Sequence, residues 1–76
     1  MDRKEEVLQA FGQRLAAIRK EKKTSLRELT AATGIKEAQL KKIEAGKVNI
    51  LFTTVIILSK ALSVNPEELL QTLDPE

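Results

Sequence analysis

Lysine side chains gather on one face of a predicted helix in the middle of the chain, where they could bind a polyanion. The segment 36–45 contains no Gly or Pro, and Leu40 and Ile43 form its single apolar stripe. At about 100° per residue, the opposite face carries Ala38, Lys41, Lys42 and Ala45. Small side chains allow close approach to a DNA groove, and ammonium groups bind phosphates or guanine edges. A solvated face of an ordinary helical bundle has the same pattern, so periodicity alone leaves both interpretations open.

A shorter helix and a tight turn are predicted directly before this segment. Ser25 followed three residues later by Glu28 is a capping box, so the helix should begin at Leu26. Gly34 can adopt the left-handed conformation that ends a short helix and turns the chain. The stretch 25–47 is therefore predicted to be a helix-turn-helix motif.

An N-terminal helix should support this motif. Apolar residues recur there at steps of three and four, which predicts a buried stripe that packs on the two helices that follow; they are Leu8, Phe11, Leu15 and Ile18.

Four blocks of the chain resemble the helix-turn-helix family of phage repressors and Cro proteins, also called the xenobiotic-response-element type. The blocks are FGQRLAAIRKEK at 11–22, SLRELTAATG at 25–34, LKKIEAGK at 40–47 and SKALSVNPEELL at 59–70. The resemblance implies an all-α, compact five-helix, lambda-repressor-like DNA-binding domain with a central helix-turn-helix. It also implies that the helix at 36–45 enters the major groove of double-stranded DNA and that the preceding helix touches the DNA backbone.

The resemblance assigns expected roles to individual residues. DNA bases would be read by Lys36, Glu37, Ala38, Lys41 and Lys42, and phosphates would be bound by Ser25, Arg27 and Lys47. Glu37 would repel phosphate but could accept a hydrogen bond from cytosine. In that family an Arg and a Glu at the places of Arg19 and Glu44 commonly pair; the alternative is that both face water, where a pair is worth about 0–1 kcal/mol.

The segment 48–58 is ambiguous from its own residues, because its β-branched and aromatic content is typical of a strand. The family register instead implies a helix at 52–62, with its inward stripe formed by Phe52, Val55, Leu58 and Leu62. Ile50 stands where many members have Pro, which favours the controllers of restriction-modification systems.

The C-terminal helices are expected to serve both the core and dimerisation. Asn65 and Pro66 should start a last helix at 66–73, whose buried face would be Leu69, Leu70 and Leu73. Ile56 and Ile57 are left pointing sideways or outward, which predicts a homodimer interface. The alternative is that one of the two isoleucines completes the monomer core.

Composition limits the function classes. The 76 residues suffice for a single domain at 1–76, and the absence of Cys and His excludes disulfides, Cys/His metal sites and the common nucleophile and base pairs. We therefore expect no enzyme, no cofactor and no metal. Residues 1–47 carry a net charge of +5 (twelve Lys/Arg, seven Asp/Glu) and residues 48–76 one of −3 (one Lys, four acids), an asymmetry that suits an oriented approach to phosphate or arises by chance.

Taken together, these patterns predict a cytoplasmic, sequence-specific transcription regulator that binds a near-palindromic operator as a dimer. No membrane span and no small-molecule effector are expected. The alternative is a protein-interaction module, such as an antitoxin or an adaptor, that uses the same fold.

Overall fold

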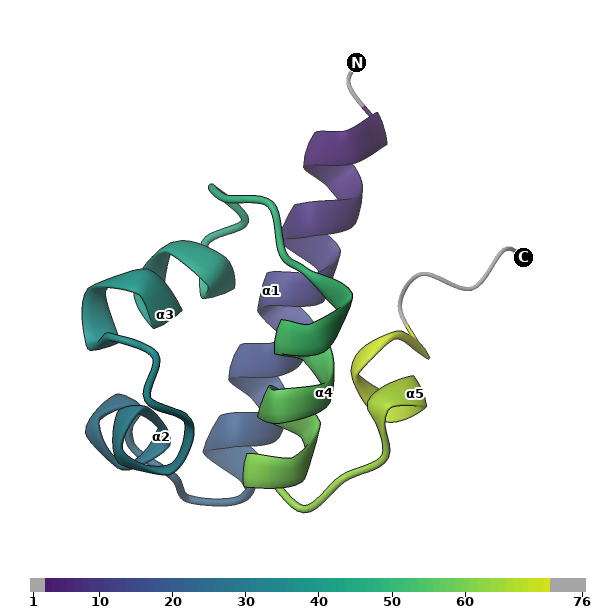
Figure 1. Cartoon of the computed structure of the whole chain (residues 1–76). Helices are drawn as coiled ribbons and strands as arrows, with labels where there is room; N and C mark the ends of the chain where they lie inside the picture. Colours follow the sequence, from purple (N-terminus) through teal and green to yellow (C-terminus); the bar gives the residue numbers. More distant parts are fainter. Residues whose placement is uncertain (1–2, 72–76) are drawn as a thin grey trace.

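Five helices account for most of residues 3–71, the part of the chain that the computed structural model describes (Figure 1). They are α1 (Arg3–Glu21), α2 (Leu26–Thr33), α3 (Glu37–Glu44), α4 (Phe52–Ala61) and α5 (Pro66–Leu69). This part of the chain contains no strand, which confirms the all-α prediction and the helical interpretation of the segment after Leu51. None of the helices described is long and apolar enough to cross a membrane.

The start and the end of α2 follow the local signals in its sequence. The Glu28 N–H donates to the Ser25 hydroxyl oxygen at 3.0 Å, and the Ser25 N–H donates to the Glu28 carboxylate at 2.8 Å. At the other end Gly34 has φ +80° and its N–H donates to the Thr30 carbonyl at 2.8 Å. The predicted capping box, the helix start at Leu26 and the glycine turn are therefore confirmed.

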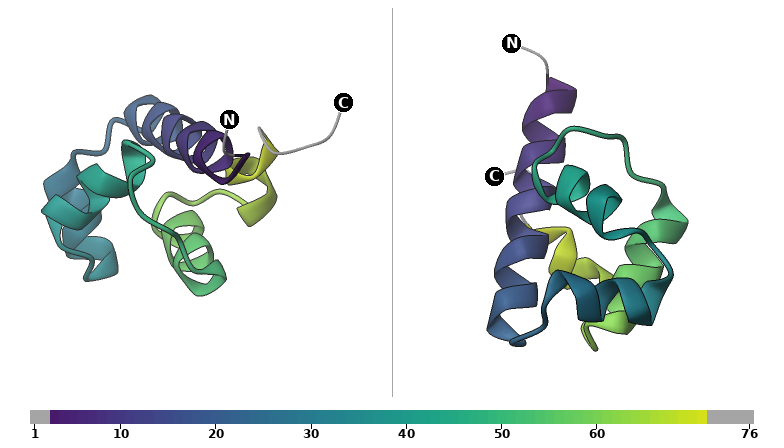
Figure 2. Two further views of the ribbon diagram at one scale, coloured as in Figure 1. Left: turned by 90° about the horizontal axis from the view of Figure 1, so that it is seen from above. Right: turned by 90° about the vertical axis from the view of Figure 1, so that its left-hand side faces the viewer.

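All five helices contribute to one apolar core. Helix α1 lies against α3 and α5, α2 packs on α3 and α4, and α4 packs on α5 (Figures 1 and 2). Within residues 3–71 the backbone of α1 closely approaches that of α3 and not that of α2, although buried side chains of α1 and α2 belong to the same core. The buried apolar side chains are Phe11, Leu15, Ile18, Leu29, Leu40, Ile43, Val55, Leu58, Leu62 and Leu69.

The inward stripe predicted for α4 was wrong at its first residue. Val55, Leu58 and Leu62 are buried as expected, but the Phe52 side chain is 70% exposed. Seven residues span almost two helical turns, so Phe52 shares a face with Ser59, which is buried. Its exposure therefore reflects its position at the very start of α4, which the spacing of apolar residues does not take into account.

The last helix is shorter than the sequence predicted. It begins at Pro66 after Asn65 as expected, but it ends at Leu69 and not at 73. The Leu70 N–H donates to the Glu67 carbonyl three residues back, which is a tightened final turn. Leu69 is buried and Leu70 half-buried, whereas the predicted contact of Leu73 lies outside the described residues.

Two glycines let α1 touch the end of α3 backbone to backbone. A Cβ on Gly12 would overlap the Glu44 carbonyl and would lie 2.6 Å from the Ile43 carbonyl oxygen. A Cβ on Gly46, whose φ is +73°, would lie 2.7 Å from the Cα of Gln9. Larger residues at Gly12 or Gly46 would therefore push α3 away from α1.

We predict that Gly12→Ala lowers the free energy of unfolding by about 1–3 kcal/mol, because the added methyl group meets rigid backbone. The sign of the change in unfolding free energy is informative, since Gly→Ala inside a helix otherwise stabilises a protein by roughly 0.5–1 kcal/mol. Urea denaturation provides the measurement. Gln13→Ala, at the next and exposed position of the same helix, is the control and should change stability little. A Gly12→Ala variant as stable as the native chain would contradict the close contact.

Candidate nucleic-acid interface

The outward face of α3 is small and basic, as the sequence predicted. Leu40 and Ile43 point into the core, while Ala38, Lys41 and Lys42 are exposed. Lys36 is also exposed, but it is the N-cap residue of the helix, with an extended backbone conformation. Helix α3 is thus one residue shorter at each end than the predicted segment 36–45.

The acidic residue on this face has a basic neighbour one turn away. The carboxylate of Glu37 lies 4.0 Å from the ammonium nitrogen of Lys41, and both side chains are exposed. Such a surface pair contributes about 0–1 kcal/mol to stability. Its chemical effect is more relevant, because Lys41 offsets the repulsion between Glu37 and phosphate while Glu37 can still accept from a cytosine amino group.

The start of α2 presents two of the predicted phosphate ligands. The Ser25 oxygen accepts the Glu28 N–H, so the hydroxyl hydrogen can still be donated to a phosphate. Arg27 is exposed in the first turn of the same helix. The Glu28 carboxylate is held at the same end by the Ser25 N–H, and it reduces the positive charge there.

Arg19 holds the C-terminal end of α3 on α1. Its Nε donates to Glu44 Oε2 at 2.7 Å, its Nη2 to Glu44 Oε1 at 3.2 Å and its Nη1 to the Thr24 carbonyl at 3.0 Å. The two side chains are only 12% and 14% exposed, so the predicted pair is confirmed and the alternative that both face water is wrong. The hydrogen bond to Glu44 raises the pKa of the Arg19 guanidinium, while its desolvation acts in the opposite direction.

A second arginine is also engaged within the protein. Arg14 donates from Nε to the Glu68 carbonyl and from Nη2 to the Gln71 side chain, each at 2.9 Å, and so joins α1 to the C-terminal segment. Arg14 and Arg19 therefore contribute to the basic charge of residues 1–47 but are committed to internal contacts. The exposed cations of this half are mainly lysines.

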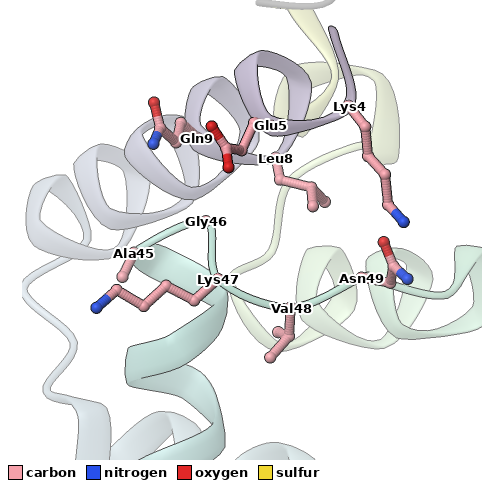
Figure 3. Close-up of a pocket in the computed structure, with 9 residues that line it drawn as sticks. All are labelled: Lys4, Glu5, Leu8, Gln9, Ala45, Gly46, Lys47, Val48 and Asn49. Atoms are coloured by element: carbon pink, nitrogen blue, oxygen red, sulfur yellow. The ribbon is translucent and has the colours of Figure 1, made fainter. Parts of the chain in front are cut away.

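Lys47 lies just beyond the end of α3, at the edge of a depression of about 550 Å³ (Figure 3). The first turns of α1 form one wall and residues 45–49 form the other. Lys47 is exposed, so its ammonium group is accessible to an anion.

Sequence reasoning missed three residues of possible functional use. Gln39 is exposed on α3 and lines a second depression of about 230 Å³, together with Leu51 among others. Leu51 and Phe52 are each 70% exposed; of the two residues predicted to form a dimer interface, Ile57 is 44% exposed and Ile56 is half-buried. The amide side chain of Gln39, on the helix predicted to enter the groove, could have marked it as a candidate DNA contact. Nothing in the sequence indicated that Leu51 would be exposed.

Comparisons with known proteins agree with this arrangement. A family model described as Helix-turn-helix matches residues 15–69. The structure is similar to that of the restriction-modification controller protein C.AhdI from Aeromonas hydrophila, with 32% identity, a TM-score of 0.79 and coverage of 82% of this chain and 94% of that chain. It shares its fold with the clp gene regulator ClgR from C. glutamicum, with 24% identity, a TM-score of 0.83 and coverage of 87% and 86%. The comparison with curated protein sequences gave no significant match.

We predict that Arg19→Lys lowers the free energy of unfolding by about 1–2 kcal/mol, because lysine keeps the charge but cannot reproduce the forked contacts with Glu44 and Thr24. Thermal and urea unfolding measure the change. Arg27→Lys, an identical exchange at an exposed position, should stay within about 0.5 kcal/mol of the native chain. Equal losses for the two variants would mean that the pair does not hold α3 in place.

Proposed function

Because this chain belongs to the Cro/C1-type helix-turn-helix family, we propose that it is a transcription regulator that inserts α3 into the major groove of double-stranded DNA. The observation that carries the proposal is the exposed face of Ala38, Lys41 and Lys42 on a helix whose end is anchored to α1. The similarity to C.AhdI, a restriction-modification controller, supports a controller-like role, as does the apolar Ile50.

Within this proposal, Lys36, Glu37, Ala38, Lys41 and Lys42 read bases, and other residues hold the backbone. The phosphate ligands are Ser25 and Arg27 at the start of α2 and Lys47 after α3. Contacts to phosphate fix the register of the protein, and contacts to base edges supply the preference for one sequence.

We further propose that two copies pair through α4. Ile57 lies on the outward side of α4 with the half-buried Ile56 next to it, and Leu51 and Phe52 are exposed at the start of the helix. Exposed apolar side chains grouped on one helix often mark an interaction site, and an apolar patch can meet its own copy across a two-fold axis. A dimer of this type would bind a near-palindromic operator with half-sites roughly 34 Å apart.

The same patch also keeps the second candidate function open. Leu51 and Phe52, each 70% exposed, could bind a different protein, as expected of an antitoxin or an adaptor. Selection of bound duplexes from a random DNA pool, followed by sequencing, separates the two functions. Recovery of a consensus supports the regulator, and recovery of none at low salt supports the interaction module.

The proposed base readers and the proposed phosphate ligand should respond differently to substitution. We predict that Glu37→Ala, Ala38→Gln or Lys41→Ala changes the preferred base at one position of each half-site, with a cost of about 1–3 kcal/mol on the original sequence. Lys47→Ala should weaken binding to all sequences alike and reduce the slope of log affinity against log salt by about one per subunit. Binding is measured on the selected operator and on its single-base variants. A shift in base preference caused by Lys47→Ala alone would show that α3 is docked differently.

The proposed dimer gives a separate prediction. Ile57→Lys should convert the dimer to a monomer in sedimentation velocity at micromolar concentration, because it places a charge in a desolvated apolar contact. Ala17→Lys adds the same charge at an exposed position of α1 and should leave the dimer intact. A native chain that is monomeric under these conditions would contradict the assigned interface.

A further inference from the structure

The first two turns of α1 extend beyond the core of the protein. The buried residues of α1 begin at Phe11, and residues 3–7 are all exposed although they are helical (Figure 2). The match to the family model begins only at residue 15, so these turns lie outside the matched part. Gln9, which follows this stretch, lies close to the backbone of Gly46.

The depression beside these turns has the chemistry of a phosphate site. Lys4 and Gln9 line it from α1, and Lys47 and Asn49 line it from the segment after α3. In Figure 3 the ammonium groups of Lys4 and Lys47 lie toward opposite ends of the depression. Two cations and two amide side chains can donate hydrogen bonds to phosphate oxygens, and Glu5 is the one acid of the lining.

The depression also lies where a DNA strand would pass. It begins at Ala45 and Gly46, directly after α3, and it is lined by Lys47, which we propose as a phosphate ligand. A strand whose phosphate binds Lys47 therefore runs beside the depression.

We propose that this depression holds the phosphodiester backbone that flanks each half-site, and that Lys4 extends the DNA contact beyond the helix-turn-helix motif. This inference rests on the proposed function, since it requires α3 to lie in the groove. The DNA strand runs along the depression between Lys4 and Lys47, and Glu5 weakens its binding.

Two matched pairs of variants test the proposal on the operator selected by the native chain. Lys4→Gln should lower the slope of log affinity against log salt by about 0.9 per subunit, whereas Arg3→Gln, next to it but outside the depression, should lower it by less than half as much. Glu5→Gln should tighten binding roughly two- to five-fold at 50 mM salt, and Glu6→Gln should change it clearly less. Circular dichroism of each variant verifies that α1 remains helical.

Each result decides between the possibilities. If both members of each pair behave alike, the charge acts from a distance and the proposed contact is wrong, while the proposed function stands. If inorganic phosphate shifts the amide resonances of Gly46 and Asn49 but the paired variants bind DNA equally, the depression binds a free anion and the proposal also fails. If the native chain selects no DNA sequence, the proposed function fails together with the inference.

Discussion

The contact between α1 and the C-terminal end of α3 determines where every candidate DNA-binding group lies. Gly12 brings the two backbones together, and Arg19 fixes the same junction through Glu44 and the Thr24 carbonyl. One guanidinium thus joins three segments, namely α1, the loop before α2 and the end of α3. The second glycine, Gly46, adds a close contact just after the helix and directs the following segment along α1.

Electrostatics explains why the Arg19 contact is valuable at this place. Glu44 is the last residue of α3, where the helix dipole disfavours a negative charge. Arg19 compensates that charge with two hydrogen bonds in a largely desolvated setting. An acid that would weaken an isolated helix therefore becomes the group that attaches the helix to its support.

Much of the fold could be predicted from the sequence because its signals are local. The capping box of Ser25 and Glu28, the turn at Gly34 and the stripe of Leu40 and Ile43 depend on residues only a few positions apart, and the structure contains all three. Ala38, Lys41 and Lys42 also follow from that stripe, since they lie on the side opposite to it. Lys36 and Glu37 became candidates only through the resemblance to the family.

The remaining features depend on contacts between distant segments. The close approach of Gly12 to α3 is invisible in a sequence where glycine within a helix only looks unfavourable. Phe52 satisfies the apolar period but lies at the start of α4, where its side chain remains exposed. Arg14 contacts Glu68 and Gln71, which are 54 and 57 positions away, so a count of the charges in residues 1–47 could not show that this arginine is engaged within the protein.

The way α3 is anchored separates recognition from folding. Its attachment uses main-chain carbonyls, two buried aliphatic side chains and the terminal Glu44, and none of these lies on the exposed face. The outward positions of α3 can therefore diverge while the scaffold keeps its stability. On the proposed function, related chains would acquire new DNA specificities by exchanging only these few side chains, and the scaffold would tolerate that evolutionary change.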